Sequence, residues 1–238
     1  MIEHFVGVFM NYLEILKSVS YAFIEHTDLS LNKEILFSNS STLIYLNLPD
    51  IPEILCDKTF YNIQNLISIL SEKYDDVTDK VIDDNNGKLI FSFKNGAKIE
   101  ILYSRILSQR NKKQKSILEF LNVTSKHDNF YEFDISGEDL KDMKKYQTMF
   151  KTKTVSLIGE KENIYFLIIN ADEDKYNKNV ALTSSGDFKC NFRLTDLPNS
   201  PMKIKVVKHY NDKTQSHHYV LISSNDYVRI NQPIVLDI

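Results

Sequence analysis

Glycine, proline and cysteine are scarce in this chain of 238 residues, with six, five and two copies respectively. So few glycines and prolines give no sign of a long disordered tract. The two cysteines, Cys56 and Cys190, lie far apart and outside any metal-ligand spacing. Both fall within apolar, strand-like runs, so we expect two buried free thiols rather than a disulfide.

Long apolar runs are also missing, since none approaches the ~20 residues that a membrane span requires. The first residues, Met1 to Phe5, lack the basic segment of a signal peptide. We therefore expect a cytoplasmic protein with no membrane partner. A net charge of -3 does not suggest a nucleic-acid partner, so any DNA contact must come from a local basic surface.

Catalytic signatures are absent as well. The sequence has no phosphate-binding Gly-x-x-x-x-Gly-Lys-Ser/Thr loop, no Gly-x-Ser-x-Gly element and no Cys-His pairing. His217 and His218 are adjacent in a strand-like run, so they point to opposite faces and cannot chelate one metal together. The acidic positions in residues 75–84 lack the order of a calcium loop, and a solvated loop is the favoured interpretation. We expect no enzyme activity, no cofactor and no metal site.

Hydrophobic residues make up 42% of the chain and charged residues 26%, which is typical of a globular protein. The first half shows a helical period, then apolar strand-like runs, then a second helical period. The Asn95-Gly96 pair between the last two strands is a strong hairpin signal. The predicted elements are a helix at 11–24, strands at 29–37, 42–48 and 54–61, a helix at 63–74, an acidic loop at 75–87, and strands at 88–93 and 97–104.

The second half repeats this order after a polar stretch. Ser136 and the acidic residues after it indicate a helix start. The predicted elements are a strand at 131–135, a helix from 136 to about 150, strands at 154–159, 164–171, 180–184 and 188–194, a turn at 195–201, and strands at 203–209, 218–223 and 227–230. Such a repeat decides the fold more firmly than a short motif. It predicts an N-terminal domain at 1–107, a connector at 108–129 and a C-terminal domain at 130–238.

Several segments of both halves carry a family resemblance. They are residues 59–70 (TFYNIQNLISIL), 87–93 (GKLIFSF), 133–141 (FDISGEDLK), 155–171, 188–194 (FKCNFRL) and 225–230 (NDYVRI). In these segments the chain resembles the DNA sliding clamps of T-even phages, which are of the same type as proliferating cell nuclear antigen. The likeness covers nearly the whole chain as a pattern with scattered identities.

The resemblance implies an α+β fold of two repeated clamp domains, each with antiparallel sheets outside and two helices on the inner face. Three chains would form a ring around duplex DNA, and the ring would tether a replicative polymerase. An ATP-dependent clamp loader would open it, and the clamp itself would hydrolyse nothing. The expected partners are double-stranded DNA, a DNA polymerase, a clamp loader and two further copies of the chain. A viral source, and with it a host-cell cytoplasm, is also implied.

A clamp needs phosphate contacts that do not depend on sequence, and lysine supplies them as a mobile point charge. Lys141, Lys144 and Lys145 share one face of the predicted helix, opposite Leu140 and Met143. The ring resemblance places that face on the channel, whereas periodicity alone favours an ordinary solvated face. The predicted DNA-facing residues are Lys17, Lys73, Lys141, Lys144, Lys145 and Lys151.

Two further surfaces follow from the resemblance. The strand at 97–104 of one subunit would pair with the strand at 180–184 of the next, with Ile99, Ile101, Tyr103, Val180 and Leu182 at the interface. The apolar ending Pro233, Ile234, Val235 and Leu236 would form a groove for a partner, or a last strand packed on the sheet. The basic run at 110–115 would lie on the connector, where a solvated loop is favoured over a DNA or partner contact.

Two alternatives stay open. One is an accessory or scaffold protein with the clamp fold that binds DNA as a monomer or in a mixed ring. The other is a metal-dependent hydrolase that uses the acidic residues of 75–84. A monomeric binder predicts direct, salt-sensitive binding to any duplex, and a hydrolase predicts metal-dependent turnover.

Overall fold

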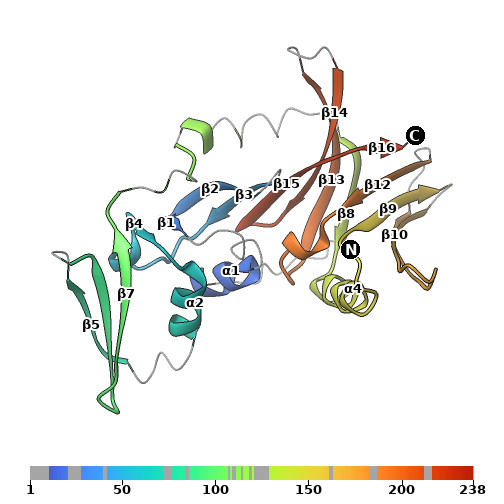
Figure 1. Cartoon of the computed structure of the whole chain (residues 1–238). Helices are drawn as coiled ribbons and strands as arrows, with labels where there is room; N and C mark the ends of the chain where they lie inside the picture. Colours follow the sequence, from blue (N-terminus) through green and yellow to red (C-terminus); the bar gives the residue numbers. More distant parts are fainter. Residues whose placement is uncertain are drawn as a thin grey trace, which may run out of the picture. The chain divides into compact units, whose positions relative to one another are not determined.

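The structure, a computed structural model, describes residues 11–20, 28–39, 42–71, 77–83, 86–106, 108, 111–113, 115–117, 120, 129–160, 163–182, 187–211 and 216–237. The chain divides into two compact units (Figure 1). Unit 1 comprises Met1–Asn39 and Tyr45–Ile117, and unit 2 comprises Ser40–Ile44 and Leu118–Ile238.

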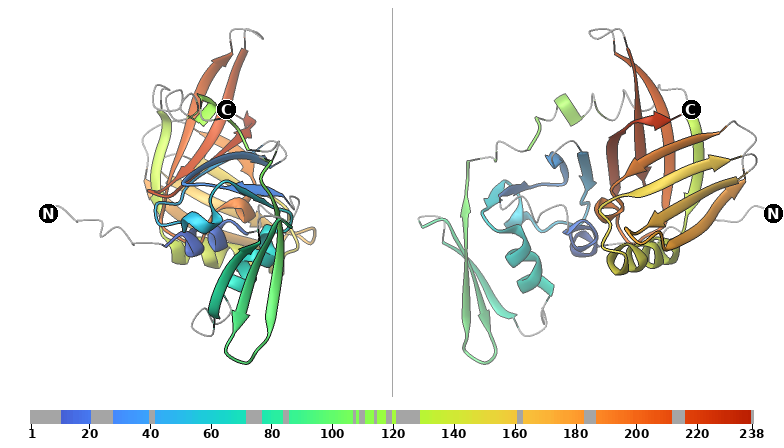
Figure 2. Two further views of the ribbon diagram at one scale, coloured as in Figure 1. Left: turned by 90° about the vertical axis from the view of Figure 1, so that its left-hand side faces the viewer. Right: turned by 45° about the vertical axis from the view of Figure 1, so that its right-hand side comes forward.

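Unit 1 combines two short helices with antiparallel strands. Its elements are α1 (Tyr12–Ser18), β1 (Leu29–Leu31), β2 (Glu34–Asn39), β3 (Thr42–Asn47, whose first residues fall in unit 2), the 3-10 turn η2 (Glu53–Leu55), β4 (Lys58–Phe60), α2 (Ile63–Ser71), β5 (Val77–Asp83), β6 (Lys88–Phe93) and β7 (Lys98–Ser104). Five strands form one sheet in the order β1-β4-β7-β6-β5, and β2 and β3 are neighbours in a second sheet. Figure 2 shows the long β5–β6–β7 ribbon in two further views.

The hairpin predicted at Asn95-Gly96 is confirmed. The Phe93 N–H donates to the Ala97 carbonyl over 3.0 Å, and Gly96 N–H donates to the Phe93 carbonyl over 2.9 Å. Gly96 has a φ of 80°, which glycine adopts without steric cost. This turn sets the register of β6 and β7.

The predicted acidic loop at 75–87 is wrong, because most of it is strand β5. This strand pairs with β6 along its whole length, from Val77 opposite Phe93 to Asp83 opposite Lys88. β-Branched residues such as Val81 and Ile82 suit a strand, and a neighbouring strand supplies the hydrogen bonds that sequence does not reveal. The loop prediction relied on the acidic residues of this segment and gave too little weight to its β-branched residues.

The strand predicted at 54–61 is also wrong in its first half. The chain there forms η2 and a turn, and Asp57 has a φ of 56°, so that only β4 is a strand. Cys56 therefore lies in a turn and is only partly buried, whereas Cys190 is buried as predicted; both are free thiols. Burial raises the pKa of the Cys56 thiol.

Unit 2 contains two sheets and one long helix. Its elements are β8 (Asn129–Ile135), α4 (Gly137–Met149), β9 (Val155–Glu160), β10 (Asn163–Ile169), β11 (Lys175–Leu182), β12 (Phe188–Phe192), the 3-10 turn η4 (Leu194–Asp196), β13 (Met202–Asn211), β14 (Ser216–Ser224), β15 (Val228–Ile234) and β16 (Leu236–Asp237). One sheet has the order β11-β10-β9-β12-β16, and the other contains β15-β14-β13-β8.

Aromatic side chains join the two sheets of unit 2. The rings of Tyr131 on β8 and Phe188 on β12 stack with centroids 3.9 Å apart. Phe133 on β8 meets the edge of Phe166 on β10 at 6.0 Å, and Phe166 also contacts Phe192 on β12 at 5.6 Å. These contacts form the core between the layers, and α4 packs on β10 and η4 (Figure 1).

Helices α1 and α4 both begin at a polar N-cap residue. Asn11 and Glu14 form a capping box at the start of α1, and Ser136 Oγ accepts the Asp139 N–H at the start of α4. The described helix α1 is shorter than the predicted 11–24, whose last residues, 21–24, lie outside the described part. Strand β11 begins at Lys175, five residues earlier than predicted. Lys175–Asn179 has no apolar alternation that would predict a strand, but its backbone pairs with β10.

Candidate nucleic-acid interface

Helix α4 turns one face to the core and leaves the other to solvent. Leu140 and Met143 are fully buried, and Gln147 continues the same buried stripe. Lys141 and Lys145 lie on the exposed face, four residues apart, and neither has an ion pair or side-chain hydrogen bond to a described residue. Two lysines at this spacing present ammonium groups to one side of the helix.

Lys144 differs from its two neighbours. It is half-buried, and its Nζ donates a hydrogen bond to the Leu197 carbonyl at the end of η4. A cation at the carbonyl end of a helical turn is favourable because the unsatisfied carbonyls there are partly negative. Lys144 therefore fastens η4 to α4, a role that helical periodicity could not reveal.

The other predicted DNA-facing lysines are scattered over both units. Lys17 on α1 is exposed, and Lys151 is exposed just beyond α4 with a φ of 53°. Lys73 lies outside the described residues. The connector run at 110–115 contributes exposed side chains at Lys112, Lys113 and Lys115.

Two lysines of β13 form ion pairs. Lys203 and Lys205 both contact the Glu132 carboxylate, at 3.0 and 2.9 Å. These two ammonium groups lower the pKa of Glu132. The pairing neutralises part of this sheet face, so the α4 face keeps the more available positive charge.

The predicted interface residues on β7 are divided between core and surface. Ile101 and Tyr103 are buried in unit 1, with 7% and 4% exposure, so they could join a neighbour only through the strand's backbone. Ile99 is partly exposed, and Leu102, which sequence reasoning missed, is the most exposed apolar residue of the strand at 54%. The alternation of β7 places Leu102 on the face opposite the core.

Backbone edges for strand pairing are present in both units. Strand β11 stands at the end of its sheet and pairs only with β10 among the described strands. Strand β7 pairs with β6 along residues 98–102, while β4 reaches only Tyr103 and Ser104 on its other side. An unpaired edge is a template for another strand. Val180 is half-buried on β11, and Leu182 ends that strand.

The apolar C-terminal segment belongs to two strands. Pro233 and Val235 are exposed, whereas Ile234 is buried at the end of β15. Leu236 lies on β16, opposite Cys190 of β12. The segment thus packs on the sheet while offering two exposed apolar side chains.

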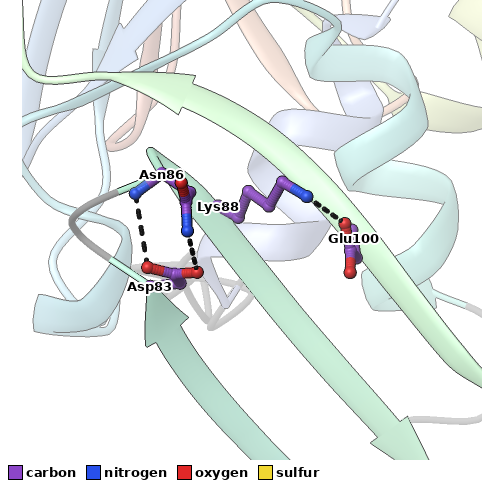
Figure 3. A network of polar contacts seen from close by, with 4 residues as sticks. All are labelled: Asp83, Asn86, Lys88 and Glu100. Atoms are coloured by element: carbon purple, nitrogen blue, oxygen red, sulfur yellow. Dashed lines mark hydrogen bonds and ion pairs between the residues drawn. The ribbon is translucent and has the colours of Figure 1, made fainter.

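Asp83 and Glu100 each bind a polar side chain close to them. The Asp83 carboxylate accepts Asn86 Nδ2 over 2.7 Å and Asn86 N–H over 3.3 Å, and Lys88 pairs with Glu100 at 2.6 Å (Figure 3). Among the described residues, no three His, Cys, Asp or Glu side chains are grouped to hold a metal ion. No helix in the described part of the chain is long and apolar enough to cross a membrane.

Comparison with known proteins identifies the fold. No protein-family model and no curated protein matches the sequence. Many solved structures are similar to the chain, among them three clamp proteins from different organisms. A DNA polymerase sliding clamp from Caulobacter crescentus has a TM-score of 0.54 at 12% identity. The match covers 95% of this chain and 64% of that one. A Helicobacter pylori β clamp bound to a DNA ligase peptide has a TM-score of 0.53 at 9% identity, covering 94% of this chain and 62% of that one.

The third is proliferating cellular nuclear antigen from Entamoeba histolytica, with a TM-score of 0.55 at 11% identity, covering 94% of this chain and 96% of that one. The chain has the DNA clamp fold, a mixed α+β fold with antiparallel sheets and few helices, as the sequence predicted. It spans about 64% of the length of the Caulobacter clamp and nearly all of the Entamoeba antigen.

Proposed function

We propose that this protein is a DNA polymerase sliding clamp, a processivity factor that encircles duplex DNA and tethers a replicative polymerase. The observation that carries the proposal is a two-unit clamp fold over nearly the whole chain. The family that the sequence resembles closes its ring with three subunits, so we propose a homotrimer. The likeness to T-even phage clamps, a viral source and a host-cell cytoplasm belong to the same proposal.

DNA contact is assigned chiefly to the exposed lysines of α4. Lys141 and Lys145 lead this set, and Lys17, Lys73 and Lys151 extend it. Such point charges neutralise phosphates without reading bases, and a protein that must slide needs that property. Lys144 instead holds α4 to η4 through its hydrogen bond to the Leu197 carbonyl.

Subunit contact is assigned to strand pairing between β7 of one copy and β11 of the next. Both strands offer backbone groups that no described strand satisfies. Ile99 and Val180 have side chains that are at least partly exposed, whereas Ile101 and Tyr103 would contribute through the backbone of β7. Leu182 belongs to the same proposed interface as the last residue of β11.

Partner proteins would bind the C-terminal unit. The Helicobacter pylori clamp holds a DNA ligase peptide, and we extend peptide binding to this chain. The exposed Pro233 and Val235, beside Ile234 and Leu236, form part of the surface for a polymerase or loader segment. The loader would hydrolyse ATP, while the clamp would need no cofactor or metal and perform no catalysis.

The deciding experiment is the native mass by light scattering over a range of concentrations, followed by retention on DNA circles. Three copies of 27.7 kDa make 83.1 kDa. A species of that mass, retained on closed circles and released when they are cut, supports the ring. A 27.7 kDa monomer at all concentrations, with direct salt-sensitive duplex binding, would favour the accessory-protein alternative.

The hydrolase alternative has its own test. Asp83 is the last residue of strand β5, and its carboxylate accepts hydrogen bonds from Asn86. Replacement of Asp83 and Asp84 by Asn should leave circle retention unchanged; metal-dependent turnover that disappears in this variant would support the hydrolase.

A further inference from the structure

The described residues that follow strand β7 are hydrogen-bonded to three strands of unit 1. We call these residues the strap: Ile106, Ser108, Asn111 and Lys112. The Ile106 carbonyl accepts the Thr59 hydroxyl of β4 over 2.7 Å. The Ser108 N–H donates to the Ser30 hydroxyl of β1 over 2.7 Å, and the Lys112 N–H donates to a carbonyl of β2, that of Leu36, over 2.7 Å. The strap therefore joins strands of both sheets.

Two hydroxyl groups connect the bonds of the strap to each other. Ser30 and Thr59 lie opposite each other in the register of β1 and β4, and their hydroxyl groups are hydrogen-bonded. A hydroxyl has one hydrogen, and Thr59 gives its own to the Ile106 carbonyl, so Ser30 is the donor to Thr59. The Ser30 oxygen in turn accepts the Ser108 N–H. These bonds form one directed chain across β1 and β4.

This chain of bonds is buried, so its members depend on one another. Ser30, Thr59 and Ser108 are 2%, 4% and 7% exposed. The Ser108 hydroxyl donates to the Asp28 carboxylate over 2.9 Å. A buried polar group that loses its partner costs more than the bond itself contributed, because water does not reach it to replace the partner. The loss of one bond therefore removes much of the stabilisation of the others.

The strap also holds the end of strand β7. In the described part of unit 1, β4 pairs with β7 at two positions, Phe60 opposite Tyr103 and Thr59 opposite Ser104. The Ser104 hydroxyl accepts the Ile106 N–H over 3.0 Å, directly beside the carbonyl that Thr59 binds. A ladder of two pairs has few backbone bonds of its own. The side-chain bond of Thr59 is therefore a large part of what fastens β4 to this end of β7.

We infer that the strap closes and opens as one unit with Ser30 and Thr59, and that it couples the start of the connector to the end of β7. A pull on the chain beyond Lys112 would strip the Asn111 amide from the Ser30 backbone. Loss of the buried chain of bonds would then release β4 from β7. The reverse also holds: a strand that orders β7 favours the closed strap, since coupling between two sites is reciprocal.

The inference rests on the proposed function in one respect, because β7 is the strand assigned to contact between copies of the chain. A closed strap holds β7 in the extended form that a neighbouring strand requires. With the strap open, this order has to be supplied on association, which lowers the affinity between copies. The connector would thus set how firmly the copies associate without touching the residues that they share.

Amide hydrogen exchange of the whole chain, at a concentration where it is monomeric, tests the coupling. Asn111→Ala breaks the connector end of the strap, where its side chain binds the Ser30 backbone. The amides of β4 and of residues 102–104 should then exchange at least about tenfold faster, because two buried backbone groups lose their partners. Thr59→Val breaks the other end at similar volume and should accelerate exchange of the Lys112 N–H. In each variant the amides at both ends should gain the same factor, since they exchange through one opening.

Two controls separate strap opening from general destabilisation. Tyr45→Phe removes a hydrogen bond of unit 1 outside the strap, from the Tyr45 hydroxyl to the Glu34 carboxylate over 2.7 Å, and should leave these amides as in the wild type. The amides of Leu89 and Phe91 on β6 report global unfolding, and their exchange should stay unchanged in every variant.

A milder variant covers a failure to fold. Ser108→Ala keeps the N–H that Ser30 accepts and removes the hydroxyl bond to Asp28, so it should accelerate both ends of the strap by a smaller common factor. Acceleration confined to the end that carries the substitution, in any of these variants, would overturn the inference.

The outcome is separable from that of the proposed function. Exchange within one chain requires neither a ring nor DNA, so coupled exchange in a chain that stays at 27.7 kDa supports the strap while the homotrimer falls. If the chain assembles, Asn111→Ala should raise the dissociation constant of the assembly at least about tenfold, the factor by which it opens the strap, whereas Tyr45→Phe should not. An unchanged constant beside coupled exchange would overturn the link between the strap and subunit contact.

Discussion

Asn111 and Ser30, 81 residues apart, are joined by a closed pair of hydrogen bonds. The Ser30 N–H donates to Asn111 Oδ1 over 3.0 Å, and Asn111 Nδ2 donates to the Ser30 carbonyl over 2.8 Å. Asn111 also forms an isolated bridge with Phe37. The predicted connector therefore begins as part of unit 1. The Asn111 side-chain amide holds it to β1 through two hydrogen bonds with the Ser30 backbone, as a neighbouring strand would.

Replacement of Asn111 tests this fastening. Asn111→Ala should lower the free energy of unfolding by about 2 kcal/mol, because it leaves two backbone groups without partners. Asn111→Asp should also destabilise, since a carboxylate cannot donate to the Ser30 carbonyl. Urea denaturation at neutral pH measures both. Lys112→Ala, an exposed neighbour, serves as control, and an equal drop in stability in that variant would contradict the assigned role.

Gly87 and Gly96 form a matched pair at positive φ, 61° and 80°. A Cβ on Gly87 would lie 2.7 Å from the Tyr103 carbonyl oxygen, whereas a Cβ on Gly96 would meet nothing within 4 Å. Gly96→Ala should cost about 1 kcal/mol, from backbone conformation alone. Gly87→Ala should cost clearly more, because the strand must also shift. Thermal unfolding of the two variants compares them directly, and equal destabilisation would rule out the close approach.

Gln147 on α4 is 3% exposed, and neither its Oε1 nor its Nε2 has a hydrogen bond among the described residues. Gln147→Leu should stabilise unit 2 by about 1 kcal/mol, because it removes the desolvation cost of two amide atoms at similar volume. Gln147→Ala removes volume too and should not show this gain. Lower stability of the Leu variant in urea denaturation would mean that the amide has a partner.

The ion pair between Asp139 and Lys178, 2.6 Å apart, ties β11 to α4. Lys178 and Ser136 lower the pKa of Asp139, so the pair stabilises the fold above the ordinary carboxyl range near 4 and loses its effect as pH falls through the lowered pKa. Both side chains are partly exposed, so Lys178→Met should cost less than about 1 kcal/mol at pH 7. Unfolding curves should show this difference shrinking toward pH 3. Lys175→Met should show no such pH dependence.

The α4 lysines should separate into two classes. Lys141→Ala or Lys145→Ala should reduce the salt dependence of duplex binding, by about 0.9 in the slope of log K against log salt for each phosphate that the variant leaves without a lysine. Lys144→Met should leave that slope unchanged while lowering the melting temperature, because its ammonium group holds the Leu197 carbonyl. A slope change in Lys144→Met with an unchanged melting temperature would reverse the assignment. The salt slopes depend on the proposed DNA contact, whereas the melting temperature does not.

Local signals in the sequence were sufficient for much of the fold. The Asn95-Gly96 turn, the Ser136 cap and the apolar stripe of Leu140 and Met143 each depend on residues within a few positions of one another, and all three are confirmed. Turn chemistry, capping and helical period are properties of short segments, so they can be read without the rest of the chain. Repetition of these signals, together with the resemblance, led to the clamp fold.

Long-range contacts decided the remainder. Strand β5 exists because β6 supplies its hydrogen bonds, and β11 begins early because β10 supplies its own. Lys144 is less exposed than Lys141 and Lys145 because its ammonium group binds the carbonyl of Leu197, 53 residues further along the chain. The contact between the Phe120 ring and the Arg229 guanidinium joins residues more than a hundred positions apart. The sequence by itself therefore determined which segments could form helices, turns and strands. Only the tertiary structure decided which polar groups and sheet edges stay free, because a hydrogen-bond partner can come from anywhere in the chain.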